Sequence, residues 1–281
     1  MKKLILLICA VLGSYTLNAQ VTTPQPSPTS KLEQKVGLTD VTIAYSRPSM
    51  RGRAIFGELV PFGEIWRTGA NQNTIVTFSD DVKIGGKDVK KGSYALFSKP
   101  NKNSWDVYFY NDTNNWGNPE KWDDSKVVAK VTATPYELPF EVETFTIDVD
   151  NLTNNGASLG IVWENTYVGV PFEVPTKEKA TASIKKVMNG PQSGDYYAAA
   201  VYYLQEGQDL DQAQEWMDKA ISEQKEAPFW MLRQKSLIQA KQGDTKGAIE
   251  TAKKSLAAAE KAGNKDYVKL NQDSIAEWGA K

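Results

Sequence analysis

The pattern of apolar and polar residues changes once along the chain, near residue 175. Between about 31 and 175, apolar residues come in short alternating runs, such as Val41, Ile43 and Tyr45. A period of two among β-branched and aromatic residues is typical of strands. From 176 onward glycine is sparse and apolar residues recur every three or four positions, which is typical of helices. The pattern predicts a mainly β domain followed by an all-α domain.

The β region contains about ten strand-like runs separated by polar turns. The clearest runs are 41–46, 74–78, 82–84, 87–89, 93–98, 105–110, 126–131, 143–149, 158–163 and 167–170. Gly85-Gly86 predicts a two-residue hairpin turn, because both turn positions then tolerate a positive φ. Short strands at this spacing predict an antiparallel β-sandwich or barrel.

Six helices are expected after residue 175. They are predicted at 176–188, 193–206, 210–224, 228–242, 245–262 and 265–278. Gly243-Asp244 and Gly263-Asn264 each combine a helix-ending glycine with a capping side chain for the next helix. Four residues recur at an offset of 35, namely Ala213, Lys219, Ala220 and Ile221 as Ala248, Lys254, Ser255 and Leu256. This repeat favours tetratricopeptide-like (TPR-like) helix pairs, with a plain helical bundle as the alternative.

The N-terminus has the features of a secretory signal peptide. Lys2 and Lys3 precede an apolar run at 4–12, and Ala19 offers a small residue for cleavage. No run in the chain is long and apolar enough for a transmembrane segment. We therefore expect an exported protein, periplasmic or extracellular. The expected division is a signal peptide at 1–19, a flexible Pro/Ser/Thr-rich leader at 20–30, the β domain at 31–175 and the helical domain at 176–281.

Two absences in the composition narrow the possible chemistry. The chain has no histidine, and its one cysteine, Cys9, lies in the expected signal peptide. This excludes Ser-His-Asp and Cys-His catalysis, His-ligated zinc or haem, and a disulfide in the mature chain. No cofactor and no metal are predicted. A net charge of −1 disfavours nucleic acid as a partner.

The arginine-rich segment (46–73) interrupts the strand pattern with four arginines among glycines and prolines. Guanidinium groups match carboxylate or phosphate, and Asn71 in a tight turn adds donors. The segment therefore predicts a site for an anionic small molecule, formed by Arg47, Arg51, Arg53, Arg67 and Asn71. The structural alternative is that these arginines pair with acids or cap carbonyls while the chain crosses the end of the sandwich.

A second candidate is the polar Trp116 loop (111–117, NDTNNWG), which follows a strong strand. An aromatic face with amide and carboxylate neighbours suits a sugar, so Trp116 is a candidate glycan contact. Calcium is less favoured, because the acidic residues match no EF-hand spacing. The structural alternative is a surface loop anchored by two tryptophans, Trp116 and, in the following run Trp122-Asp123-Asp124, Trp122.

Two further sets of residues suggest other functions. Without histidine, paired carboxylates are the remaining route to glycoside cleavage, with Glu64, Asp112, Asp123 and Glu164 as candidates. The helices hold many aromatic residues, which either form their core or line a groove for a partner peptide: Tyr196, Tyr197, Tyr202, Tyr203, Trp216, Trp230 and Trp278.

Several motifs of the β region resemble the family called "domain of unknown function 2911" (DUF2911). They are Tyr45-Ser46-Arg47-Pro48, Arg51-Gly52-Arg53, Leu59-Val60-Pro61-Phe62-Gly63, Trp66-Arg67-Thr68-Gly69-Ala70-Asn71 and Tyr94-Ala95-Leu96-Phe97. The resemblance covers about 38–175. It implies a protein secreted by Bacteroidota-like bacteria, with a β domain before a helical tail, and it implies no particular activity or site residue.

The leading interpretation is a non-catalytic binding or scaffold module of the periplasm or cell envelope. Its β domain is expected to contact an anionic small molecule or a glycan, and its helices a protein partner. The alternatives are a histidine-independent hydrolase that cleaves glycans through paired carboxylates, and a purely structural envelope component.

Overall fold

The computed structural model describes residues 23–188 and 190–280, which divide after Thr176 into two compact units. The expected signal peptide at 1–19 lies outside the described residues. Among the residues that are described, no helix is long and apolar enough to cross a membrane.

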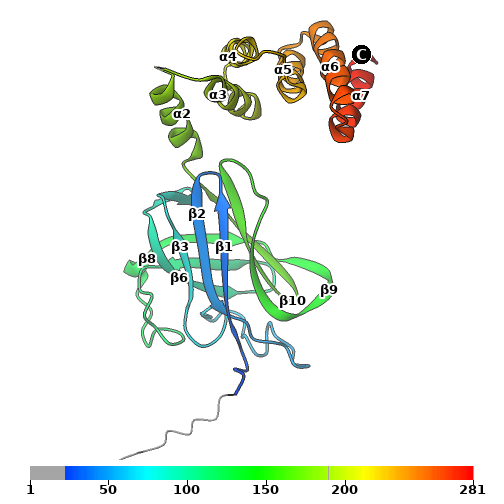
Figure 1. The fold of residues 1–281 in the computed structure, drawn as a ribbon. Coiled ribbons are helices and arrows are strands. Elements are labelled where there is room, and N and C mark those ends of the chain that lie inside the picture. Colours follow the sequence, from blue (N-terminus) through cyan, green and yellow to red (C-terminus); the bar gives the residue numbers. More distant parts are fainter. Residues whose placement is uncertain (1–22, 189, 281) are drawn as a thin grey trace, which may run out of the picture. The chain divides into compact units, whose positions relative to one another are not determined.

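The first unit is an antiparallel β-sandwich of ten strands within the described residues. One sheet has the order β1-β2-β3-β6-β7-β8 and the other the order β5-β4-β10-β9 (Figure 1). The strands are β1 (Thr29–Val36), β2 (Thr39–Ser46), β3 (Thr74–Phe78), β4 (Val82–Ile84), β5 (Lys87–Val89), β6 (Gly92–Pro100), β7 (Trp105–Tyr110), β8 (Val127–Ala133), β9 (Tyr136–Asp150) and β10 (Gly156–Glu173). The predicted fold class, a β domain followed by helices, is confirmed.

The strand pattern matches the expectation closely except at β10, at β1 and in the first half of β9, where residues 136–142 lie outside the predicted run 143–149. Gly85 and Gly86 form the predicted two-residue hairpin between β4 and β5, both with positive φ. The runs 158–163 and 167–170 are wrong as separate strands, because β10 continues through them. The interruption in the pattern is an irregularity in pairing around Glu164, which itself has a φ of 54°.

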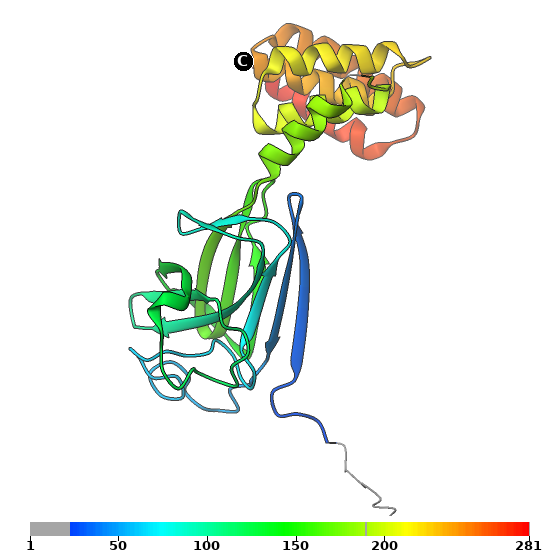
Figure 2. The same cartoon turned by 90° about the vertical axis from the view of Figure 1, so that its left-hand side faces the viewer.

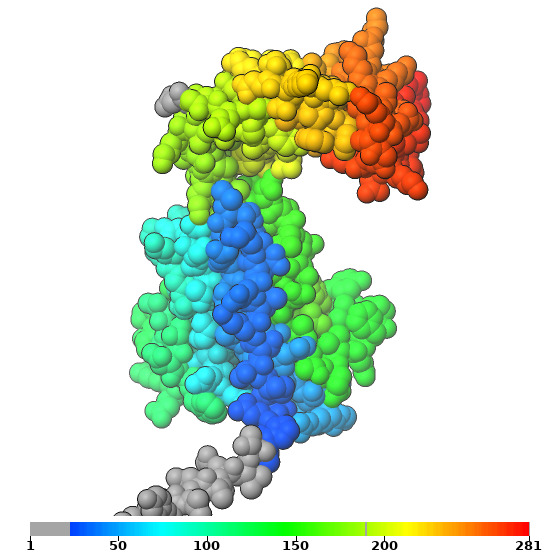
Figure 3. Space-filling view, in the orientation of Figure 1, coloured from blue at the N-terminus to red at the C-terminus, as the bar shows by residue number. Residues whose placement is uncertain are grey.

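The second exception is β1, which has no counterpart among the predicted runs. Its outward face carries Lys31, Glu33 and Lys35, and β1 is an edge strand paired only with β2. In the space-filling view β1 and β2 form the blue surface of the sandwich (Figure 3). An edge strand with a charged face buries few side chains, so its apolar signal is weak.

The arginine-rich segment closes one end of the sandwich, the lower end in Figure 1 and Figure 2. Ile55 is fully buried, and the rings of Phe56 and Trp66 contact Trp105 and Trp163 in the core. The backbone of Trp66 exchanges two hydrogen bonds with that of Ser98 in β6. The glycines and prolines of this segment therefore let the chain turn repeatedly while its aromatic residues fill the core.

The second unit consists of six helices within the described residues: α2 (Thr176–Val187), α3 (Ser193–Glu206), α4 (Leu210–Ser222), α5 (Phe229–Gln242), α6 (Thr245–Lys261) and α7 (Lys265–Gly279). From α3 to α7, each helix packs against the next, and α5 also contacts α3 and α7. The predicted capping residues are confirmed, because the Asp244 and Asn264 side chains cap the N-termini of α6 and α7. Gly243 ends α5 in the left-handed conformation.

Candidate functional site

The Trp116 loop leaves β7 and is fixed against the last residues of the arginine-rich segment. Trp116 forms an isolated antiparallel bridge with Gln72. The Asn73 side chain donates to the Gly117 carbonyl at 3.0 Å, and the Asn73 backbone N–H donates to the Asn115 carbonyl at 3.4 Å. The backbone is therefore held on both sides of Trp116.

The two tryptophans at this loop have different environments. The Trp122 ring contacts Phe97, Tyr108 and Tyr110 at centroid distances of 5.5, 5.2 and 4.8 Å, on the outer face of the six-stranded sheet. Trp116 has 74% of its surface exposed. Trp122 thus anchors the chain, whereas the Trp116 side chain is presented to solvent from a fixed backbone.

Trp116 and Gln72 lie between two surface hollows. The first has a volume of about 410 Å³ and is lined by Gln25, Pro26, Thr29, Ser46, Asn71, Gln72 and Trp116. The second, of about 310 Å³, is lined by Gln72, Asn73, Ile75, Thr113, Asn114, Asn115 and Trp116. Both hollows share one exposed aromatic side chain and are rich in carboxamide groups.

Among the described residues, no charged side chain lines either hollow. Carboxamides and hydroxyls both donate and accept hydrogen bonds, so they match a ligand that carries many hydroxyl groups. An exposed indole offers an apolar face to the C–H side of a sugar ring. The surface around Trp116 is therefore suited to a neutral, hydroxyl-rich ligand.

Three of the four arginines named from the sequence are hydrogen-bonded within the fold. Arg47 donates to the Phe145 carbonyl and the Thr146 hydroxyl. The Arg51 and Arg53 guanidinium groups donate to backbone carbonyls of Pro26, Met50 and Ser49. None of the four arginines lines either hollow. This geometry favours the carbonyl-capping alternative for Arg47, Arg51 and Arg53.

Arg67 lies beside Gly117 of the Trp116 loop. A Cβ atom added to Gly117 would lie 3.6 Å from Nη1 of Arg67. The Nε atom of Arg67 is buried without a hydrogen-bond partner, and burial lowers the pKa of the guanidinium below its ordinary value. Arg67 thus lies against the loop that carries Trp116 but outside the hollows.

Of the residues predicted for a ligand site, Asn71 and Trp116 are brought to the same hollow. Asn71 has a φ of 60° and donates to the Ser27 carbonyl and the Ser46 hydroxyl, which fixes its side chain. The sequence reasoning missed the other lining residues, above all Gln25 and Thr29, because residues 20–30 read as a leader. The carboxamide-rich run Gln72-Asn73 was a usable signal, since it resembles Asn114-Asn115 in composition.

The two candidate carboxylates closest to Trp116 in sequence are both paired. Asp112 lies 2.8 Å from the Lys126 ammonium and accepts from the Asn114 backbone N–H. Asp123 accepts from both the backbone N–H and the hydroxyl of Ser125. These hydrogen bonds lower the pKa of both carboxyl groups. The largest effect on Asp112 comes from Lys126, and the largest effect on Asp123 comes from Ser125. A general acid for glycoside cleavage needs a raised pKa instead.

We expect carbon-detected NMR titration to give pKa values below 3.8 for both Asp112 and Asp123. A carboxyl group with a depressed pKa stabilises the fold above its ordinary pKa, and this contribution is lost as pH falls through the folded pKa. Lys126→Met should return Asp112 toward its ordinary value and change Asp123 much less. A pKa above 3.8 for either group would instead support an acid role.

The comparisons with known proteins identify one family. No curated protein and no solved structure matches the chain. A family model described as "Protein of unknown function (DUF2911)" matches residues 27–172, more than half of the 281 residues. The match begins earlier than the resemblance read from the sequence, so it includes β1 and Thr29 of the first hollow together with the whole Trp116 loop. The chain therefore belongs to the DUF2911 family.

Proposed function

We propose that this protein is an exported, non-catalytic binding module of the cell envelope whose β domain binds a neutral glycan at Trp116. Export rests on the basic and apolar residues at the N-terminus. The observation that carries the binding role is the 74% exposed indole of Trp116 between two hollows lined by carboxamides. The same observation favours a glycan over the anionic small molecule, because the part of the chain that the structure describes places no cation in the lining of the hollows to balance a negative charge.

The fixed backbone around Trp116 supports this role. An exposed side chain on a mobile loop loses conformational freedom when it binds, and that loss weakens affinity. Here the bridge to Gln72 and the two hydrogen bonds of Asn73 hold the loop before any ligand arrives. The two hollows on either side of Trp116 also fit a chain of sugars that passes over the indole better than a single compact ligand.

The hydrolase alternative has weaker support than binding. Retaining and inverting glycosidases need one carboxyl group that is protonated at working pH. Asp112 and Asp123 both have lowered pKa values, and Glu164 accepts a hydrogen bond from the Ile55 backbone N–H. These carboxylates are therefore better explained as contacts that hold loops.

The test is titration of the mature chain with soluble neutral polysaccharides by calorimetry and by NMR of the indole N–H groups. We expect saturable binding that shifts the Trp116 indole resonance. Trp116→Ala should weaken binding at least tenfold, which corresponds to about 1.4 kcal/mol. The free energy of unfolding should change by less than about 0.5 kcal/mol, since the side chain is exposed.

Trp230→Ala is the matched control, because Trp230 is also an exposed tryptophan but lies in the helical unit. It should leave polysaccharide binding unchanged. Binding that survives Trp116→Ala, or saturation only by anionic ligands, would contradict a neutral glycan site at Trp116.

We also propose that the helices form TPR-like pairs, α3 with α4 and α5 with α6. The 35-residue repeat supports this pairing, because Ala213 of α4 and Ala248 of α6 occupy equivalent positions and both are fully buried. Small residues at such positions allow close approach of two helices. Helix pairs of this kind suit a scaffold that contacts a protein partner.

A further inference from the structure

Arg233 is a buried cation to which the described residues supply no counterion. It lies on α5 with 9% of its surface exposed. No hydrogen bond or ion pair joins its guanidinium to another residue that the structure describes, and its Nη1 atom is fully covered. Buried charges in folded proteins are almost always paired, because removing a charge from water is costly. The positive charge of Arg233 is therefore not balanced by an anion among the described residues.

The surroundings of Arg233 are aromatic. Its guanidinium carbon lies 5.9 Å from the centre of the Trp278 ring of α7, and the Tyr267 hydroxyl of the same helix is close enough to act on it electrostatically. Burial lowers the pKa of the guanidinium below its ordinary value. A cation–π contact offsets only part of the cost of burying the charge. These neighbours orient the guanidinium but leave its charge without an anion.

One edge of the guanidinium is available to a ligand. Of its three nitrogens, only Nη1 is both fully covered and without a partner, so the Nε–Nη2 edge is the one that reaches solvent. This edge presents two parallel N–H groups, the geometry that receives the two oxygens of a carboxylate.

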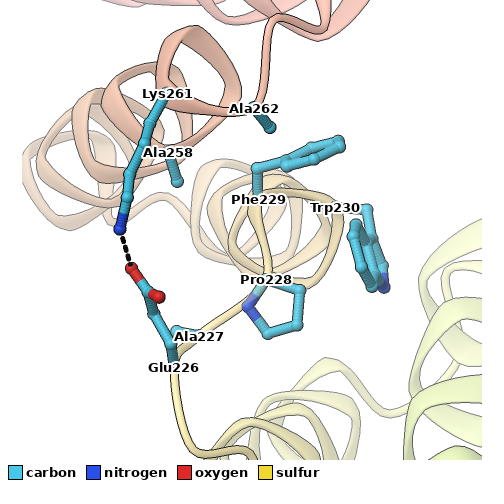
Figure 4. Close-up of a pocket in the computed structure, with 8 residues that line it drawn as sticks. All are labelled: Glu226, Ala227, Pro228, Phe229, Trp230, Ala258, Lys261 and Ala262. Atoms are coloured by element: carbon cyan, nitrogen blue, oxygen red, sulfur yellow. Dashed lines mark hydrogen bonds and ion pairs between the residues drawn. The ribbon is translucent and has the colours of Figure 1, made fainter.

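An apolar hollow begins one helical turn before Arg233. It has a volume of about 370 Å³ and is lined by Glu226, Ala227, Pro228, Phe229, Trp230, Ala258, Lys261 and Ala262 (Figure 4). Glu226 and Lys261 pair with each other at 2.9 Å across its edge, so neither needs a ligand. Phe229 and Trp230 precede Arg233 by four and three residues, which places all three on neighbouring positions of the α5 surface.

We propose that the helical unit binds a peptide segment that carries an apolar side chain beside a carboxylate group. The apolar side chain occupies the hollow at Pro228, Phe229 and Trp230. The carboxylate pairs with the Nε–Nη2 edge of Arg233. The ligand thus supplies the counterion that residues 23–188 and 190–280 do not provide.

A carboxylate fits this site better than a phosphate group. One guanidinium balances one negative charge, and the rings of Trp278 and Tyr267 add no second cation. A phosphate with up to two negative charges would leave charge unbalanced in a partly buried place. The neighbouring apolar hollow also favours a ligand whose charge is attached to an apolar group.

The test uses the mature full chain with four small probes at constant ionic strength and pH 7. N-acetylphenylalanine has both features, N-acetylphenylalaninamide lacks the charge, acetate lacks the apolar group, and inorganic phosphate replaces the carboxylate. We expect N-acetylphenylalanine to shift the Arg233 side-chain and Trp278 indole NMR resonances in a saturable way. Acetate should bind at least tenfold more weakly, and the amide and phosphate should cause no saturable shift at Trp278.

Two variants separate recognition from packing. Arg233→Met keeps the length of the side chain and removes the unpaired charge, so it should abolish binding and raise the melting temperature of the helical unit. Arg233→Lys keeps the charge but loses the paired N–H groups, and it should weaken binding at least tenfold. Lys269→Met is the control, because Lys269 is a lysine of α7 that pairs with Asp273 and does not line the hollow, and it should leave binding unchanged.

One more pair of probes shows whether the site binds the C-terminal carboxylate of a peptide or a side-chain carboxylate. N-acetylphenylalanine presents a terminal carboxylate, whereas N-acetyl-Phe-Glu-amide presents only a side-chain carboxylate, and the tighter of the two identifies the source. The proposal is overturned if Arg233→Met lowers the melting temperature, which would assign the cation a structural role against Trp278. It is equally overturned if the amide binds as well as the acid, or if Arg233→Lys binds like the unaltered chain.

Discussion

Replacing Trp163 with alanine is expected to lower the free energy of unfolding of the β domain by about 4 kcal/mol. Trp163 is 1% exposed, and its ring contacts Phe56, Trp66 and Phe145. Its indole N–H donates to the Glu143 carbonyl at 3.1 Å. The substitution leaves a large cavity and removes one of the two hydrogen bonds to the Glu143 carbonyl, which keeps the bond from the Met50 N–H, and both effects reduce stability. Urea denaturation followed by circular dichroism measures the difference.

Trp116→Ala is the matched control for this prediction, because it removes the same side chain from the same domain. With 74% of Trp116 exposed, its loss should change the free energy of unfolding by less than about 0.5 kcal/mol. Equal losses for the two variants would mean that Trp116 is part of the packing, and the proposed glycan site would lose its central residue. The pair of variants therefore separates the structural tryptophan from the functional one.

The sequence distinguishes these two tryptophans but not Trp116 from Trp122. Trp163 follows Leu159 and Ile161 at a spacing of two, which predicts an inward-facing strand position. Trp116 and Trp122 both lie in a polar stretch without periodicity. What separates them is tertiary contact, because the outer face of β6 and β7 offers Phe97 and Tyr110 to Trp122. The residues around Trp116 and Trp122 in the sequence do not indicate which of the two packs on that face of the sheet.

The arginine-rich segment is a second case in which tertiary contacts could not be predicted from the sequence. Four arginines in 21 positions were a clear signal of charge, but the partners of Arg47 are Phe145 and Thr146, almost a hundred residues away. Every residue has a backbone carbonyl that can accept a hydrogen bond, so the sequence does not show which carbonyl an arginine will bind. The sequence could therefore identify the segment as unusual without showing that its guanidinium groups support the end of the sandwich.

The helices were predicted to within two residues because their boundaries depend on local chemistry. Asp244 and Asn264 accept hydrogen bonds from backbone N–H groups three residues later, and Gly243 adopts the left-handed conformation that few other residues reach. These interactions span only a few residues, so the sequence contains them completely. The Arg233 guanidinium, by contrast, has no anionic partner among the described residues. That depends on which side chains of other helices surround it, so only the structure reveals it.

The hairpin between β1 and β2 gives the second large effect. Gly37→Ala is expected to lower the free energy of unfolding of the β domain by at least about 3 kcal/mol. Gly37 has a φ of 55°, and an added Cβ would lie well under 3.0 Å from both the Thr176 hydroxyl oxygen and the Asn154 carbonyl oxygen. Relieving that overlap requires movement of the turn, which would also break the hydrogen bond from the Leu38 N–H to Thr176.

Gly52→Ala isolates the part of this effect that comes from backbone conformation. Gly52 has a similar φ of 72°, but an added Cβ would meet no atom within 4 Å. Its loss should be about 1 kcal/mol, the cost of holding alanine at a positive φ. Equal losses for Gly37→Ala and Gly52→Ala in the same urea titration would show that the turn yields at little cost. A larger loss at Gly37 would instead show that the turn after β1 is held tightly where it meets Thr176.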